Sequence, residues 1–465
     1  MNFVEALETK NTFTENGAVT NSSTLNDCVN LFFTIGAMRG GDKSRLIKLF
    51  SKAFNEDSTT SLRILFWARD IRFGAGERQI FRDIMVYLAE NHTDSLRKNL
   101  QYVTEFGRWD DLECLFGTKL ETEALQIIVQ GLRDGNGLCA KWTPRKGPIF
   151  NKIRKVFGIT PKELRKKLVY GSKTVEQLMC SNNWNLIEYP KTPSLAMARY
   201  TNSFVKHDRD RFVEFIQSLK SGQSKINTGA VYPYDVLKTL KYGDKELATE
   251  QWKSLPNFME GCTEKILPVV DVSGSMGKMI STGVNCMDVA ISLGLYISER
   301  NEGEFKDLFV TFSESPVIQK LRGDLYDRYE QLETADWGMS TNVEAVFDLI
   351  LNTATRSNLS QADMPTKILI MSDMEFNECS NFDLSAFEMM SAKYKDHGYD
   401  LPGIIFWNIQ SRNENFPVRF DESNTALISG FSPSILKSIL GGKELSPIMV
   451  MNETIQNPRY EMIKG

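Results

Sequence analysis

The chain has 465 residues, of which 42% are hydrophobic and 25% charged, and its formal net charge is −4 at pH 7. A chain of this length predicts two or three domains, and the composition is typical of a soluble globular protein with a substantial core. The net charge excludes a chain that is polycationic throughout. A surface for nucleic acid therefore has to be a local patch.

Cysteine usage, histidine usage and hydropathy exclude several classes of protein. The seven cysteines form no C-x-x-C pair and their number is odd, which argues against a zinc ribbon and a disulfide framework. The three histidines lie far apart. Glu5, Glu8 and Lys10 stand where a signal peptide would be apolar, and no stretch approaches the roughly 18 apolar residues of a membrane span. We expect a soluble, cytoplasmic protein without a membrane partner.

The first half of the chain has a helical pattern. Residues 1–24 are polar and predict a mobile arm or an extended cover. From 25 to 255 apolar residues recur at three- and four-residue steps, as in Ile80, Ile84 and Leu88, and glycine-containing breakers separate the segments. This spacing predicts an all-helical domain over 25–255, built as a bundle or as a HEAT-like stack of helix pairs.

The second half alternates short apolar runs with longer amphipathic segments. Apolar strands that alternate with helices predict a mainly parallel sheet covered on both faces, here over residues 263–445, with 446–465 as a C-terminal tail. The predicted fold class is thus α followed by α/β. The apolar runs are Ile266–Val270, Leu308–Phe312, Ile368–Met371, Gly403–Trp407 and Ala426–Ile428, and the amphipathic segments lie at 284–299, 342–355, 384–396 and 432–440.

Polar side chains follow the predicted strands. Ligands of open parallel sheets bind beyond the carboxyl ends of the strands. Carboxylates and hydroxyls there are oxygen donors suited to a hard cation. We predict a divalent cation, Mg²⁺ with Mn²⁺ or Ca²⁺ as alternatives, at Asp271, Ser273, Ser275, Thr341 and Asp373. With two carboxylates among its ligands, such an ion stays electron-poor and would accept an acidic oxygen from a partner. Two other interpretations stay open: these residues cap the following helices, or the motif holds no functional ion.

The order of these residues resembles a known metal site. D-x-S-x-S at Asp271–Ser275, then Thr341 and then Asp373, is similar to the metal-ion-dependent adhesion site (MIDAS) of von Willebrand factor A domains. The resemblance covers roughly 264–445. It implies a doubly wound parallel sheet with the ion at its carboxyl edge.

A strong charge asymmetry marks residues 141–173, which we name the basic segment. It contains eleven lysines and arginines and one acid, Glu163, and aromatic residues are interleaved with them. Cations neutralise phosphates, and exposed aromatic rings stack on unpaired bases. A solvated helix face is the alternative interpretation. The predicted RNA-binding residues are Lys141, Trp142, Arg145, Lys146, Lys152, Arg154, Lys155, Arg165, Lys166 and Lys167.

The order of the two halves adds a second resemblance. A helical module followed by a von Willebrand factor A domain resembles the Ro ribonucleoproteins, whose helical TROVE ring binds structured and defective RNA. A TROVE-like family of plants, fungi and large DNA viruses, which has no settled activity, is more similar still. The phrases that carry the resemblance are Phe66–Arg69, Gly74–Arg78, Gly107–Leu112, Ala140–Arg145, Thr192–Ser194 and Ser372–Phe376.

The sequence therefore predicts a non-enzymatic, ribonucleoprotein-like protein that binds structured or single-stranded RNA and carries a divalent-metal site for a ligand or a partner. The alternative is a protein–protein scaffold whose metal site grips an acidic residue of a partner. A metal-dependent hydrolase fares worst, because no general base or nucleophile accompanies the predicted ligands.

Overall fold

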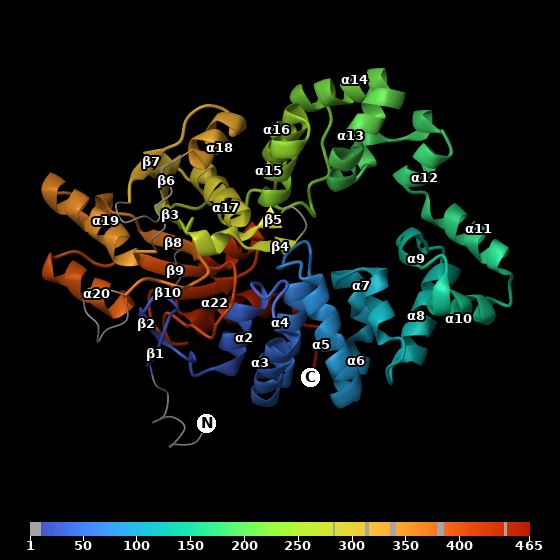
Figure 1. Ribbon diagram of the computed structural model, residues 1–465, viewed down its shortest axis with the longest axis horizontal. Coiled ribbons are helices and arrows are strands. Elements are labelled where there is room, and N and C mark those ends of the chain that lie inside the picture. Colours follow the sequence, from blue (N-terminus) through green and yellow to red (C-terminus); the bar gives the residue numbers. More distant parts are fainter. Residues whose placement is uncertain (1–10, 282–283, 312–315, 335–340, 379–385, 441–443) are drawn as a thin grey trace.

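The computed structural model describes residues 11–281, 284–311, 316–334, 341–378, 386–440 and 444–465. The chain forms a helix-rich N-terminal half and a C-terminal half built on a six-stranded sheet (Figure 1). The predicted order of a helical region followed by an α/β region is confirmed. None of the helices among these described residues is long and apolar enough to cross a membrane.

The N-terminal half begins with a short antiparallel hairpin, β1 (Asn11–Phe13) and β2 (Val19–Asn21), and continues as helices. Figure 1 shows that these helices follow an open arc, which leaves the sheet half after α8 and returns to it at α15 and α16. The helices are α2 (Asp27–Ile35), α3 (Lys43–Glu56), α4 (Ser58–Arg69), α5 (Arg78–Asn91), α6 (Thr93–Asn99), η1 (Leu100–Tyr102), α7 (Val103–Phe106), η2 (Trp109–Leu115), α8 (Glu121–Arg133), α9 (Gly137–Trp142), α10 (Gly147–Phe157), α11 (Pro161–Ser172), α12 (Val175–Cys180), η3 (Trp184–Leu186), η4 (Tyr189–Lys191), α13 (Ser194–His207), α14 (Arg209–Lys220), α15 (Pro233–Tyr242) and α16 (Lys245–Lys253).

The C-terminal half is a sheet with strand order β10-β9-β8-β3-β6-β7. Its neighbouring strands are parallel except for β7, which pairs antiparallel with β6 at one edge. The strands are β3 (Ile266–Val270), β6 (Leu308–Thr311), β7 (Ile318–Lys320), β8 (Lys367–Ser372), β9 (Gly403–Asn408) and β10 (Thr425–Ser429), and a separate hairpin is formed by β4 (Met279–Ser281) and β5 (Val284–Asn285).

The helices of the C-terminal half lie between and around these strands. Helix α17 packs on β3, β6 and β8, in agreement with the continuously buried side chains of β3 and β8. Those helices are η5 (Gly274–Gly277), α17 (Cys286–Arg300), η6 (Gly303–Phe305), α18 (Leu325–Glu333), α19 (Val343–Ser357), η7 (Gln361–Asp363), α20 (Ala386–Asp396), η8 (Pro433–Ile435), α21 (Leu436–Ile439), α22 (Pro447–Ile455) and η9 (Pro458–Tyr460).

The two halves share one hydrophobic core. Helix α2 packs on the edge strand β10, where the Ser429 hydroxyl donates to the Phe32 carbonyl at 2.7 Å. A Cβ on Gly36 would lie 2.7 Å from the Ser429 backbone, so a glycine is required for this close approach. Residues 446–465 fold back as α22 and η9, which contact α4 of the helical half. A second, smaller core lies in the arc around α13 and α14.

Candidate strand-end metal site and basic helical face

The parallel pairing of β3 and β8 brings the first and last predicted metal ligands together. Val270 is in register with Met371, and the Asp271 amide donates to the Met371 carbonyl at 2.9 Å. Asp271 and Asp373 therefore leave neighbouring strands at the same edge of the sheet. Both are buried. We refer to Asp271, Ser273, Ser275, Thr341 and Asp373 as the strand-end cluster.

The loop after β3 turns its oxygens toward one another. The Ser273 amide donates to Asp271 Oδ1 at 2.9 Å, and the Ser372 hydroxyl donates to Asp271 Oδ2 at 2.6 Å. The hydroxyl oxygens of Ser273 and Ser275 lie 2.9 Å apart. Burial and then the nearby charge of Asp373 raise the pKa of Asp271 to about 6, although these hydrogen bonds lower it. Negative charge at this edge is thus incompletely neutralised.

Thr341 reaches the same edge through the segment that follows Asp373. The Thr341 amide lies 3.4 Å from Asn377 Oδ1, and the Asn377 amide donates to the Thr341 carbonyl at 3.1 Å. Thr341 does not cap the following helix, because the side chain of Asn342 accepts from the Ala345 amide at the start of α19. Part of the predicted Gly338–Asn342 loop, residues 338–340, lies outside the described residues.

An arginine that the sequence analysis did not select contacts the cluster. Arg412 Nη2 lies 2.6 Å from Asp373 Oδ2, and Arg412 Nη1 lies 3.2 Å from a carboxylate oxygen of Glu15 in the N-terminal hairpin. The hairpin also reaches the cluster's neighbour Glu375, whose Oε2 accepts from the Glu15 amide at 2.7 Å. Asp373 thus already has one cationic partner within the chain.

The residues present suit a hard divalent cation. Within the described residues no group of three histidine, cysteine or acidic side chains is arranged so that it could hold a metal ion. An ion at this edge would therefore depend on hydroxyls as well as carboxylates, which is the chemistry that Mg²⁺ accepts. Asp271 has hydrogen bonds on both oxygens, so a water-bridged role suits it better than direct contact. Arg412 and the ion would share Asp373. Burial and then the Asp373 charge raise the pKa of the neighbouring Cys286 thiol to about 12, so this thiol is not a nucleophile.

The basic segment folds as three short helices with apolar inner faces. Phe150 and Ile153 of α10 and Leu164 and Leu168 of α11 are buried. Thr160 starts α11, where its hydroxyl and the Glu163 carboxylate form a reciprocal capping box. Glu163, the one acid of the segment, is thereby used in holding the helix start, and its charge also interacts with that of Lys166.

Ten of the eleven cations of the basic segment divide into two sets, and the eleventh, Lys141, is half-buried with its Nζ 5.4 Å from the centre of the Trp142 ring. Arg145 donates to the carbonyls of Ala140 and Thr143, and Arg154 donates to the carbonyl of Ile159, so both arginines hold turns. Lys152 pairs with Glu121 of α8. That is the one ion pair of the eleven cations that the described part of the chain contains. The exposed cations without a carboxylate partner there are Lys146, Lys155, Lys162, Arg165, Lys166, Lys167 and Lys173.

The aromatic residues of the segment differ in accessibility. Tyr170 is 75% exposed, whereas Phe150 is 2% exposed and belongs to the core. The Trp142 ring is half-buried with the Arg108 guanidinium 3.8 Å from its centre, so its face is already occupied. Tyr170 is thus the accessible aromatic ring of this surface, which we call the basic face.

Comparisons with known proteins place the chain. Residues 265–461 match a family described as a domain of unknown function (DUF7788), and residues 14–127 and 150–260 match a second one (DUF2828). The "Uncharacterized protein L728" of Acanthamoeba polyphaga mimivirus is 30% identical over 505 aligned positions, which cover 96% of this chain and 87% of the viral one. The chain belongs to the family of this mimivirus protein. The predicted kinship with proteins of large DNA viruses is confirmed.

The DUF2828 match ends at residue 260 and the DUF7788 match begins at residue 265, near the start of the sheet half. A solved structure, the Ro (RSR) protein of Deinococcus radiodurans, aligns with 88% of this chain and 91% of its own chain at a TM-score of 0.37 and 13% identity.

Arg412 could have been predicted from the sequence, because polar side chains that follow parallel strands gather at the carboxyl edge of the sheet. Strand β9 ends at Asn408, and the polar run Gln410-Ser-Arg412 follows after Ile409. Because β9 neighbours β8, that run was bound to reach the edge where Asp373 lies. Arg412 is a cation and offers no oxygen to a metal ion, so a pattern of oxygen ligands does not select it.

Proposed function

We propose that this protein binds RNA through the basic face of α10 and α11, without catalysing a reaction. The observation that carries the proposal is the set of exposed lysines that have no carboxylate partner in the described structure. Several cations elsewhere in the helical half are paired with acids, as Arg69 is with Asp111. A face that leaves like charges unpaired is self-repelling until a polyanion covers it.

The aromatic content of the face favours single-stranded RNA over a duplex. Tyr170 stands exposed on α11, among the lysines, and its ring can stack on an unpaired base. A duplex would offer phosphates but no free base face. The free thiols of the six described cysteines suit a reducing compartment such as the cytoplasm, where such RNA is met.

The charge of the basic face can be tested without disturbing its ion pair or its turns. We would replace Lys155, Lys162, Lys166 and Lys167 by glutamine and measure binding to a fluorescent single-stranded RNA by anisotropy across a salt series. Each lost phosphate contact removes about 0.7 from the logarithmic salt slope, so the slope should flatten by about 3.

A matched control has the same charge change at exposed lysines elsewhere: Lys225, Lys306, Lys320 and Lys395 to glutamine. Its affinity and salt slope should stay near those of the wild type. Equal losses in both quadruple variants would mean that RNA responds to overall charge and not to the basic face, and the proposal would fail. The scaffold interpretation would then lead.

We further propose that the sheet half is a von Willebrand factor A-type domain whose strand-end cluster holds Mg²⁺ or a similar divalent cation. Ser273, Ser275 and Thr341 would offer hydroxyl oxygens, Asp373 a carboxylate, and Asp271 a water-bridged carboxylate. The ion would supply a Lewis-acidic position for an acidic oxygen of a protein partner. The raised pKa of Asp271, caused by burial and then by Asp373, supports this, because it reports negative charge that a cation would relieve.

Thermal melting in EDTA and in MgCl₂ tests the ion. Ligand binding to the folded state raises stability by about 2.7 kcal/mol at a hundred times Kd. The wild type and the exposed-site control Asp396→Asn should therefore gain stability with Mg²⁺, whereas Asp373→Asn should not. Arg412→Gln should respond at lower Mg²⁺ than the wild type, because the guanidinium no longer competes for Asp373. The same response in all four proteins would place any bound Mg²⁺ elsewhere.

A further inference from the structure

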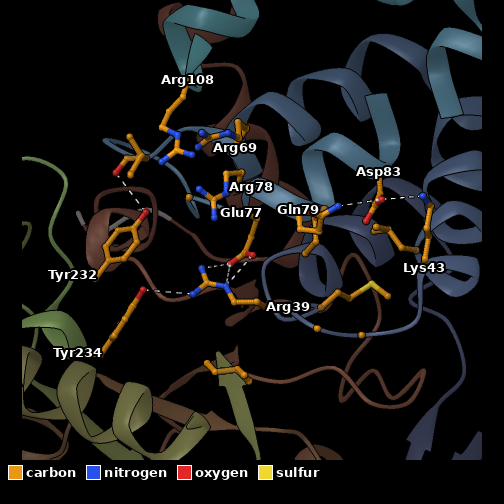
Figure 2. A pocket seen from close by; sticks show the side chains of 18 of the residues that line it. Arg39, Lys43, Arg69, Glu77, Arg78, Gln79, Asp83, Arg108, Tyr232 and Tyr234 are labelled. Atoms are coloured by element: carbon orange, nitrogen blue, oxygen red, sulfur yellow. Dashed lines mark hydrogen bonds and ion pairs between the residues drawn. The ribbon is translucent and has the colours of Figure 1, made fainter. Parts of the chain in front are cut away.

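A pocket of about 540 Å³ lies where the helical arc returns toward the sheet half. Its walls come from the start of α3, the α4–α5 connection, the start of η2, the segment before α15, and Ile280 of β4. This volume is in the range of small-molecule sites. Figure 2 shows Arg69, Arg78 and Arg108 gathered on one side and Tyr232 and Tyr234 on another. The basic face of α10 and α11 contributes no residue to the pocket's lining.

Most of the cations in the pocket wall have carboxylate partners. Arg39 binds the carboxylate of Glu77 with its Nε and Nη2 atoms, the shortest distance being 2.7 Å. Lys43 pairs with Asp83 at 2.9 Å. Each of these pairs is neutral overall, and Figure 2 shows both among the side chains that line the pocket.

Arg78 is different. Within the described residues its guanidinium makes no ion pair and no hydrogen bond, although its side chain lines the pocket. Partial burial lowers its pKa, and the positive charges of Arg108 and Arg82 lower it further. An arginine held among other arginines without a carboxylate of its own marks a point of positive potential.

The carboxylates nearest Arg78 are engaged by other arginines. Four guanidiniums, those of Arg69, Arg78, Arg82 and Arg108, gather here. Asp111 accepts from Arg69 and Arg82 at 2.7 Å each, and Asp110 accepts from Arg108 at 2.5 Å. Of these four guanidiniums, that of Arg78 is the one without a hydrogen-bonded carboxylate among the described residues.

The start of α5 adds donors to the same wall. Glu77 occupies the N-cap position, but its side chain makes no capping bond because it is engaged by Arg39. The amides of the first turn, at Gln79 and Ile80, therefore lack a side-chain acceptor. Both residues line the pocket. Backbone amides at a helix start and two arginines form a donor set that suits a phosphate group.

The rest of the pocket is less polar and closely built. Met38, Ile71, Leu195, Ala230 and Ile280 line it. A Cβ on Gly76, which has a φ of +71°, would lie 2.0 Å from the Tyr232 hydroxyl oxygen, so the glycine of the Gly74–Arg78 phrase lets this tyrosine close the wall. An anion bound here would carry an organic group against these apolar side chains.

We infer that this pocket binds a phosphorylated small molecule, with the phosphate at Arg78 and Arg108 beside the first turn of α5 and the organic part along the apolar wall. The site is separate from the basic face and stands or falls independently of RNA binding there.

Isothermal titration with inorganic pyrophosphate, ADP and adenosine tests this inference on the full chain. Pyrophosphate and ADP should bind saturably, and adenosine at least about tenfold more weakly than ADP, because it lacks the charged group. Arg78→Gln should weaken ADP at least about tenfold, since it removes charge-assisted bonds. Arg78 makes no ion pair or hydrogen bond with the described residues, so melting should show a stable variant.

Arg72→Gln is the matched control, because Arg72 is an exposed arginine of the same connection that does not line this pocket. ADP binding to it should stay within about twofold of the wild type, and the quadruple lysine variant of the basic face should behave likewise. Absence of saturable binding of pyrophosphate and ADP up to about 5 mM would overturn the inference. Equal weakening by Arg78→Gln and Arg72→Gln would overturn it too.

Discussion

Two cation-rich regions of the helical half use their charges in opposite ways. Around Asp111, arginines from α4 and α5 converge on one fully buried carboxylate, with Arg69 itself 2% exposed. On the basic face, lysines point to solvent and the described structure offers most of them no carboxylate. Pairing with burial ties elements of the fold together. Exposure without pairing leaves charge available for a ligand, so the arrangement of cations, and not their number, separates the two roles.

The largest effect should come from breaking the buried side of this comparison. Asp111→Ala would leave Arg69 buried without its partner and would also remove an acceptor for the Arg108 amide at 2.8 Å. Loss of one partner of a buried pair costs about 3–5 kcal/mol. Urea unfolding should show a loss of that size. Asp94→Ala, which removes an exposed carboxylate paired with Arg97, should leave the curve nearly unchanged.

A milder loss for Asp111→Ala, equal to that for Asp94→Ala, would mean that water or a rearranged acid replaces the carboxylate. The buried pairs around Asp111 would then not be what distinguishes this region from the basic face.

Two aromatic residues of the basic segment, the buried Phe150 and the exposed Tyr170, allow the structural and the ligand-binding role to be compared within one surface. Phe150→Ala should cost about 3–5 kcal/mol of stability, because a buried ring is replaced by a cavity. Tyr170→Ala should leave stability nearly unchanged and weaken single-stranded RNA binding by about 1–3 kcal/mol through lost stacking. Anisotropy and urea unfolding on both variants separate the two effects. If Tyr170→Ala binds RNA as the wild type does, the ring has no role in recognition.

The sequence predicted what depends on local periodicity. Apolar runs placed β3, β8, β9 and β10 to within one residue at each end, because a strand buried on both faces needs a continuous apolar run. The periodicity of the sequence also indicates that Tyr170 is exposed, in contrast to the buried Phe150. Leu164 and Leu168 mark the inner face of α11 at a four-residue step, and Tyr170 lies off that stripe.

The sequence could not predict which distant side chains pair in the folded chain. Asp110-Asp111 reads as a helix start, and η2 does start there, but the partners of Asp111 lie 29 and 42 residues away on other helices. Nothing in the local pattern selects Arg69 and Arg82 over other arginines. Likewise, the packing of α2 on β10 joins residues almost four hundred positions apart, which only the folded chain brings together.

The strand-end cluster allows paired and unpaired charge to be compared for carboxylates. It gives the smallest expected effect on the free energy of unfolding. The folded pKa of Asp271, about 6, lies above the roughly 3.9 of an unfolded aspartate, because burial and then Asp373 disfavour the charged form. Its contribution to stability is therefore complete below about pH 4 and is lost as the pH rises through 6. In EDTA, the free energy of unfolding of Asp271→Asn should therefore fall by about 1–2 kcal/mol less than that of the wild type between pH 4.5 and 7.5.

Comparing the change with pH, not the stability at one pH, isolates this charge. Asparagine keeps an oxygen that can accept from the Ser273 amide but loses the second carboxylate oxygen, to which Ser372 donates, and that loss is the same at every pH. Asp396→Asn, at an exposed position, should retain the wild-type pH profile. Parallel profiles for Asp271→Asn and the wild type would show that Arg412 already neutralises this edge. The cluster would then resemble the paired arginines around Asp111, and the argument for a bound cation would lose its electrostatic support.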